Sequence, residues 1–344
     1  MRILTLLAFL LVLPVAALAQ ADQPISAETP QQSLARAQSL LQQGNVTQAM
    51  GVLHQLESVL PPVKGLNHEL GIAYYRTSKL SEAQKAFAAA IQEDPSDKES
   101  VQMEGLTLYR MGQPVKAIPY LERVRDWMPN ADADSNYVLG LCYMNARRYD
   151  DARNAFAREF KVDSASASAY LLLGNMLMRA NLSELAAGQA QKALQLDPKL
   201  PLAHFMLGEV YLSKSDVQNA TREFEQERRL NPGYAPTYDR LGDLYTRIGK
   251  LQEAQQALTK AISLDTSSTG PFIQMGKVLL HRDDPVTAIM YLRHAEKMDP
   301  SNFITHTLLA QAYRKTGRED ASKRETEMAS KIHAADALKL QPIH

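Results

Sequence analysis

The chain repeats one pattern of small and helix-breaking residues at an interval of 34 residues, except for one interval of 35 residues between the third and fourth blocks. Blocks that start at residues 30, 64, 98, 133, 167, 201, 235, 269 and 303 each have glycine or alanine at their eighth position. Eight blocks have alanine at position 20, and six have proline at position 32. Periods of this length are typical of chains that stack one supersecondary unit many times, since a single unit cannot bury its apolar face alone.

The sixth block shows how the apolar residues follow the spacing of two consecutive α-helices. Leu207, Gly208 and Tyr211 fall on one face of a first helix, because residues three or four positions apart share a face. Ala220 and Phe224 repeat this spacing in a second helix. Proline at position 32 ends that helix because it has no amide hydrogen and clashes with the preceding turn. Each block is therefore predicted to be a helix, a short turn and a second helix.

Glycine recurs at position 8, although glycine inside a helix costs about 0.5–1 kcal/mol relative to alanine. Seven such glycines at one position need a common cause, and close approach of the paired helix supplies it. We expect the alanine at position 20 of the second helix to face this glycine. Glycine at position 15 suits the turn between the two helices, as in Gly44, Gly112, Gly249 and Gly317.

This pattern resembles the tetratricopeptide repeat family over about nine blocks, residues 30–336. The resemblance implies an all-α fold, a right-handed superhelical solenoid of about nine helix-turn-helix repeats. The first block is predicted to cap the array, because polar Ser33 and Arg36 stand at apolar positions. The ninth block is predicted to lack one residue in its turn. Its second helix is expected to continue past Ala335 as a C-terminal cap, and residues 337–344 are assigned to a tail.

Residues 1–19 have the three parts of a secretory signal peptide. Arg2 is followed by an apolar run, and Ala17 and Ala19 precede a predicted cleavage site ahead of Gln20. The unbroken run ends at Pro14 and is too short to span a bilayer. We therefore predict export to the periplasm or the extracellular space, with no transmembrane segment in the mature chain. A retained N-terminal anchor is the alternative. Residues 20–29 are polar and are predicted to be a flexible leader.

Charge and cysteine content exclude several classes of partner and site. Lys and Arg number 38, as do Asp and Glu, so no strong field attracts nucleic acid. Cys142 is the one cysteine, which excludes an intramolecular disulfide and a cysteine-clustered zinc site. On a helix it is expected to be a small buried apolar residue.

Motifs for catalysis, metal binding and cofactor binding are missing from the sequence. The eight histidines form no HExxH motif, and His204 and His306 at position 4 are predicted to be packing residues. We predict no catalytic residues, no metal ligands and no cofactor, and therefore a protein that is not an enzyme. The enzymatic alternative would use Asp239, Asp243, Lys277 and His281 as a polar cluster.

In the tetratricopeptide repeat family, the first helices line a concave groove, and the resemblance places positions 2, 5, 9, 12 and 13 on it. The peptide-binding groove is predicted to contain Ile72, Tyr75, Arg76, Leu106, Tyr109, Arg110, Tyr137, Leu141, Met144, Leu171, Asn175, Met178, Arg179, Phe205 and Leu212. Contiguous exposed apolar residues indicate a binding surface. Two alternatives stay open: the apolar residues are buried against the next repeat, or the arginines are solvated helix ends.

Two functions fit these features. The first is a non-enzymatic exported scaffold that binds a protein or a peptide through its groove. The second is a structural assembly factor of a cell-envelope machine for secretion, pilus formation or polysaccharide export, joined through its convex face or its ends. The sequence names neither the partner nor an oligomeric state.

Overall fold

The computed structural model describes residues 28–127 and 134–339, and every regular element in these residues is an α-helix. They form two compact units, one ending at Gly112 and the other beginning at Gln113. The boundary falls in the predicted turn of the third block. The predicted signal peptide, most of the leader and the extra residue between the third and fourth blocks lie outside the described residues. No described helix is both long enough and apolar enough to cross a bilayer.

The first unit contains five helices that begin and end where the period predicts them. They are α1 (Pro30–Gln42), α2 (Val46–Leu56), α3 (Leu66–Arg76), α4 (Leu80–Glu93) and α5 (Lys98–Arg110). Helices α1 and α2 pair with each other, as do α3 and α4, and α5 packs on both α3 and α4. Apolar residues from α1 to α4 form one core that includes Leu41, Leu53 and Leu70.

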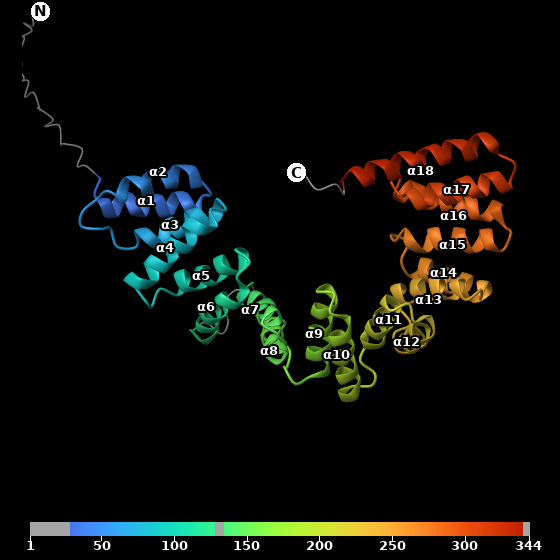
Figure 1. Ribbon diagram of the computed structural model, residues 1–344, viewed down its shortest axis with the longest axis horizontal. Coiled ribbons are helices and arrows are strands. Elements are labelled where there is room, and N and C mark those ends of the chain that lie inside the picture. Colours follow the sequence, from blue (N-terminus) through green and yellow to red (C-terminus); the bar gives the residue numbers. More distant parts are fainter. Residues whose placement is uncertain (1–27, 128–133, 340–344) are drawn as a thin grey trace, which may run out of the picture. The chain divides into compact units, whose positions relative to one another are not determined.

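The second unit contains the remaining thirteen described helices. They are α6 (Pro114–Trp127), α7 (Asp134–Asn145), α8 (Tyr149–Glu159), α9 (Ala167–Arg179), α10 (Ser183–Leu196), α11 (Ala203–Ser213), α12 (Val217–Leu230), α13 (Ala235–Arg247), α14 (Leu251–Leu264), α15 (Gly270–His281), α16 (Pro285–Met298), α17 (Phe303–Lys315) and α18 (Glu319–Lys339). From α7 onward, each odd-numbered helix pairs with the next, as Figure 1 shows for α17 and α18. The predicted all-α fold of helix-turn-helix repeats is confirmed.

One residue in every turn within a repeat has a left-handed backbone. Position 15 has a positive φ in all nine described repeats, between 58° at Asn181 and 81° at Gly44. Glycine occupies this position in four repeats, as predicted, and Ser78, Arg147, Asn181, Ser215 and Asp283 occupy it in the others. The turn therefore fixes a conformation that glycine adopts without steric cost.

Two glycine-to-alanine substitutions are expected to change stability in opposite directions. Gly249→Ala places a Cβ at φ +78° and should lower the free energy of unfolding by about 1 kcal/mol. Gly188→Ala lies inside α10, where a Cβ meets no atom within 4 Å, and should raise it by about 0.5–1 kcal/mol. Chemical denaturation of both variants checks this, and shifts of the same sign would contradict the assigned backbone conformations.

The residue that faces the position-8 glycine is the one at position 24, and not the alanine at position 20 that we expected. A Cβ on Gly71 would lie 2.5 Å from the ring of Phe87, and one on Gly208 would lie 2.7 Å from Phe224. Gly242 meets Leu258 in the same way. The glycine is therefore required by a large side chain of the paired helix that lies flat against its backbone.

The fifth repeat keeps the glycine but fills the space differently. Its position 24 is the small Ala190, and the atom closest to a Cβ on Gly174 is the sulfur of Met206, at 2.6 Å. Met206 belongs to the first helix of the next repeat, and methionine adapts readily to irregular gaps. The closest approach at this position therefore comes from the neighbouring repeat, and the backbone carbonyl oxygen of Ala186, at position 20, lies 3.4 Å from the same Cβ.

The ninth repeat has a turn of ordinary length, so the predicted deletion is wrong. Helix α17 ends at Lys315 and α18 begins at Glu319, which leaves the same three-residue turn as in the other repeats. Ser322 occupies position 20, where the other eight repeats have alanine; it is 2% exposed, and its hydroxyl donates to the Ala310 carbonyl at 2.8 Å. The hydroxyl is satisfied within the core, and α18 continues to Lys339 as the predicted extension.

Candidate partner-binding surface

Most of the predicted groove residues lie partly exposed on the first helices. In the first unit these are Ile72, Tyr75, Leu106 and Tyr109, and in the second they are Tyr137, Leu141, Met178, Phe205 and Leu212. We call these nine residues the first-helix surface. The polar members of the prediction, Asn175, Arg76, Arg110 and Arg179, are exposed. Each unit thus presents apolar side chains at the repeat positions that the sequence singled out.

Two predicted groove residues are buried instead. Met144 is 7% exposed and Leu171 is 8% exposed, so neither offers a contact area to a partner. For these two side chains the packing alternative holds, and they stabilise the second unit.

Phe205 is held in place by aromatic neighbours from its own repeat. Its ring lies edge-on to Phe224 at 5.3 Å and to Tyr234 at 5.2 Å between centroids. Tyr137 similarly lies 5.7 Å from Phe156. The two contacts of Phe205 are edge-to-face and that of Tyr137 is tilted, and aromatic pairs of this kind add about 0.5–1.5 kcal/mol to the burial of the rings. Phe205 and Tyr137 are therefore preorganised, which lowers the entropy lost when a partner binds.

Arg76 and Arg110 act between repeats. Each stands at position 13, and each donates from Nη1 to a backbone carbonyl 35 residues earlier, Arg76 to Leu41 and Arg110 to Tyr75. The guanidinium of Arg110 also lies over the Tyr75 ring, 4.5 Å from its centroid. A cation at the C-terminal end of the preceding first helix donates to the last carbonyls of that helix and interacts favourably with the helix dipole. These two arginines thus lie exposed at helix ends, as the solvated alternative predicted, and they also join neighbouring first helices by hydrogen bonds.

A buried carboxylate, which the sequence analysis did not identify, positions the start of α11. Glu227 of α12 is completely buried and accepts hydrogen bonds from the amides of Leu202, at 2.9 Å, and Phe205, at 3.3 Å. Leu202 precedes α11 and has no capping side chain of its own. The carboxylate of Glu227 therefore caps the N-terminus of α11 from the paired helix, where the helix dipole favours negative charge.

Ion pairs occupy the charged positions that follow the apolar ones. Arg240 contacts Glu209 at 2.6 Å, and Arg247 contacts Asp243 at 2.6 Å. Asp239 has one fully buried oxygen, Oδ1, without a hydrogen-bond partner. Burial raises the pKa of the Asp239 carboxyl, and the nearby carboxylates of Asp243 and Glu209 add to this effect. Asp243 belongs to the polar cluster of the enzymatic alternative, but its carboxylate is already paired with Arg247.

Cys142 is buried, as expected, and is not a reactive thiol. Cys142 belongs to α7 and has no exposed surface, and burial raises the pKa of its thiol to about 12. Only the thiolate is nucleophilic, so the folded protein should not react with thiol reagents at neutral pH.

A network of carboxylates surrounds His68 in the first unit. Asp97 Oδ2 lies 2.7 Å from Nδ1, Glu99 Oε2 lies 3.6 Å from Nε2, and Glu69 Oε1 lies 4.0 Å from Nε2. The hydroxyl of Ser100 is also within 3.0 Å of Nδ1. Glu99 and Asp97 raise the pKa of His68 to about 9 although burial acts in the opposite direction. The imidazolium therefore ties α3 to the start of α5.

The contribution of His68 to stability should disappear in alkaline solution. Because its pKa is raised from 6.5 to about 9, folding favours the protonated form. The stabilisation should be complete below pH 6.5 and should decline as the pH rises through 9. The difference in unfolding midpoint between wild type and His68→Gln should shrink over this interval. His281→Gln, at the exposed end of α15, is the control, and a constant difference for His68→Gln would contradict the assignment.

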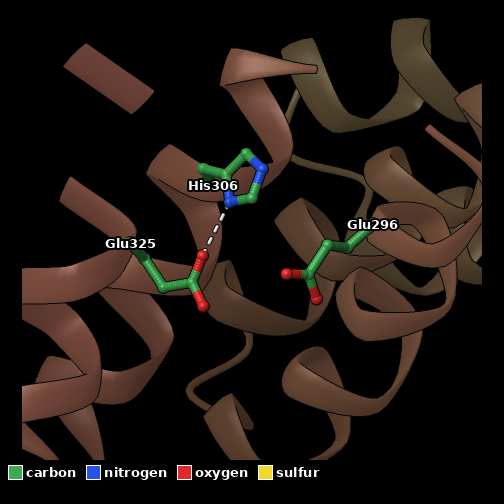
Figure 2. Close-up of side chains that lie close together, drawn as sticks. All are labelled: Glu296, His306 and Glu325. Atoms are coloured by element: carbon green, nitrogen blue, oxygen red, sulfur yellow. Dashed lines mark hydrogen bonds and ion pairs between the residues drawn. The ribbon is translucent and has the colours of Figure 1, made fainter. Parts of the chain in front are cut away.

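Two histidines at position 4 pair with glutamates of the second helix. His204 Nδ1 lies 2.8 Å from Glu223 Oε2, and His306 Nδ1 lies 2.7 Å from Glu325 Oε2. Figure 2 shows His306 and Glu325 with Glu296 of the preceding repeat close by. Both histidines pack between the helices of a hairpin, as predicted, and both pairs join the two helices.

Family comparisons agree with the repeats seen in the structure. Models described as tetratricopeptide repeat match residues 68–136, 102–159, 137–201 and 235–268. No curated protein matches the chain.

Several solved structures are similar to the chain at low identity. The crystal structure of MamA is 21% identical, covers 48% of this chain and 96% of its own, and has a TM-score of 0.44. That of YrrB, described as a TPR protein with an unusual peptide-binding site, is 22% identical, covers 56% of this chain and 100% of its own, and has a TM-score of 0.47. PilF of Pseudomonas aeruginosa is 18% identical, covers 56% and 88%, and has a TM-score of 0.46.

Proposed function

We propose that this chain, a tetratricopeptide repeat protein, is an exported scaffold that binds a protein or peptide partner through its first-helix surface. Proteins of this family are non-enzymatic scaffolds for protein interactions. The site and the export are the parts of the proposal that are specific to this chain.

The observation that carries the site is the repetition of partly exposed apolar side chains at equivalent positions of the first helices. Tyr75 and Tyr109 in the first unit and Met178 and Phe205 in the second are examples. Aromatic and methionine side chains give a large contact area at low entropic cost or with adaptable shape. An extended or helical peptide with an apolar face is the partner that such a surface fits.

Export is supported by the sequence of the first 19 residues. If the segment is a signal peptide, N-terminal sequencing of protein from the envelope fraction or the medium should begin at Gln20. Recovery of the chain with its original N-terminus would contradict cleavage there.

Single aspartate substitutions test the site in each unit separately. Tyr75→Asp and Met178→Asp should each reduce the partner recovered by crosslinking in an envelope extract, because a carboxylate in an apolar contact is desolvated without compensation. Met290→Asp is the control, since Met290 is 69% exposed on α16, a second helix. Circular dichroism of each variant verifies that the helices are retained.

The two functional hypotheses give opposite results in this experiment. Unchanged recovery with Tyr75→Asp and Met178→Asp, combined with a loss for Met290→Asp, would reject the first-helix surface. That outcome would favour an assembly factor that is joined through its second helices.

A further inference from the structure

Three side chains of the types that bind metal ions meet where the last two repeats join. They are Glu296 of α16, His306 of α17 and Glu325 of α18, and their nearest ligand atoms lie within 4.8 Å of one another (Figure 2). His306 is 3% exposed. Each residue comes from a different helix, so no spacing within one helix reveals the cluster.

The hydrogen bond made by Nε2 of His306 determines whether Nδ1 can carry a lone pair or a hydrogen. Nε2 lies 3.0 Å from the carbonyl oxygen of Pro300, which can only accept a hydrogen bond, so Nε2 carries a hydrogen and donates it. Nδ1 is then the atom that points at the Glu325 carboxylate, 2.7 Å away. A lone pair on Nδ1 would repel that oxygen unless a positive centre lies between them. A proton or a metal ion satisfies this requirement.

We propose that Glu296, His306 and Glu325 form a binding site for a divalent transition-metal ion, with zinc as the reference ion. His306 Nδ1 and one oxygen of each carboxylate are the ligands, and water completes the coordination. Zinc binds imidazole nitrogen at about 2.0–2.1 Å and carboxylate oxygen at about 2.0–2.2 Å, so two ligand atoms of a tetrahedral ion lie about 3.3 Å apart. His306 Nδ1 and Glu325 Oε2 are 2.7 Å apart and must separate slightly to share one ion. A histidine ligand that donates its other N–H to a backbone carbonyl is the usual arrangement at such sites.

The carboxylates have the freedom that this coordination requires. The side chain of Glu296 is 21% exposed, and a rotation about its torsions brings an oxygen toward His306. Glu325 already contacts Nδ1 and needs only a small displacement. Bound in this way, the ion would hold α16, α17 and α18 together at the C-terminal end of the second unit, which makes it a structural site.

Arg293 is the competitor of the metal ion. Its Nη1 lies 2.7 Å from Glu296 Oε2 and 3.8 Å from Glu325 Oε1, so it neutralises part of the charge of these carboxylates. Its side chain is 51% exposed and can swing into solvent when an ion enters. Removing its positive charge should therefore strengthen metal binding.

The sixth repeat provides an internal comparison. His204 and Glu223 occupy the same repeat positions as His306 and Glu325 and have the same contact, at 2.8 Å. The position of Glu296 is occupied there by Leu194. The histidine of the sixth repeat thus has one carboxylate nearby, whereas His306 has two. Glu296→Leu gives the ninth repeat the same residues as the sixth at these positions.

Calorimetric titration of the full chain with zinc chloride, in a buffer free of phosphate, tests the proposal. Wild type should bind zinc, and Glu296→Leu and Glu325→Gln should each weaken the Kd at least tenfold, since each removes one of three protein ligands. Arg293→Gln should tighten the Kd. His204→Gln should leave it unchanged. Zinc should also raise the unfolding midpoint of wild type and His204→Gln more than that of Glu296→Leu.

Glu296→Leu is the decisive variant because it leaves the contact between His306 and Glu325 intact. The proposal is overturned if wild type binds no zinc at millimolar concentration. It is equally overturned if Glu296→Leu and Glu325→Gln titrate like wild type, because the ion then binds elsewhere.

Discussion

Replacing Phe224 by alanine is expected to lower the free energy of unfolding by about 3–5 kcal/mol. Phe224 has no exposed surface, and its ring fills the space above the backbone of Gly208. It belongs to a core with Leu241 and Leu244 of the next repeat, so the cavity would weaken an interface between repeats as well as one hairpin. Chemical denaturation followed by circular dichroism measures the change.

Phe224→Leu is the matched control for this prediction. Repeats seven and eight have Leu258 and Leu292 at this position, each against the position-8 glycine of its own repeat. Leucine therefore fits the site, and Phe224→Leu should lower the free energy of unfolding clearly less than Phe224→Ala. Gly208→Ala tests the contact from the other side, because its Cβ would lie 2.7 Å from the Phe224 ring. If the two residues press on each other, the double variant should cost less than the sum of Gly208→Ala and Phe224→Ala. Strict additivity would contradict the contact.

The helices were predictable because the same pattern of apolar, small and helix-breaking residues occurs in nine blocks. Proline and glycine end or bend the chain at fixed positions, and the apolar spacing between them fits only a helix. The partner of the position-8 glycine was not predictable in this way. Ala220 and Phe224 lie one turn apart on the same face of α12, and sequence spacing fixes a face without fixing how far the paired helix is shifted along it.

The ninth turn shows a different limit. Position 20 is alanine in the other eight repeats and Ser322 in the ninth. Without this alanine the alignment of the second helix with the other repeats was not recognisable, and the turn was predicted to be one residue short. Its hydroxyl is tolerated because Ala310 offers a carbonyl, a partner that only the packed hairpin provides.

The first-helix surface was only partly predictable for a related reason. Repeat position correctly indicates that Met178 and Phe205 lie on the first helices, but exposure depends on how closely the next repeat packs. Met144 and Leu171 are covered in this chain, although they occupy equivalent positions. The interhelix hydrogen bonds of Arg76 and Arg110 were likewise hidden, because their partners are backbone carbonyls 35 residues away.

Replacing Glu227 by alanine should destabilise the sixth repeat by about 3 kcal/mol, because hydrogen bonds to a charged group contribute about 1.5–3 kcal/mol and their buried donors would be left unpaired. The amides of Leu202 and Phe205 lose their acceptor, and no side chain before α11 replaces it. Glu227→Gln keeps one acceptor oxygen of similar shape and should lose less. Denaturation of both variants gives the two free energies, and equal losses would mean that the charge at the helix terminus contributes nothing.

The same substitution should weaken partner binding, because Glu227 holds the backbone of Phe205. Phe205 is a member of the first-helix surface, whereas Glu227 is completely buried and cannot touch a partner. We expect Glu227→Ala to reduce the partner recovered even at a temperature where circular dichroism shows α-helix content equal to wild type. Phe205→Ala provides the comparison, since both variants remove an ordered ring from one place. Normal recovery with Glu227→Ala and reduced recovery with Phe205→Ala would show that the ring binds without needing the cap that orders it.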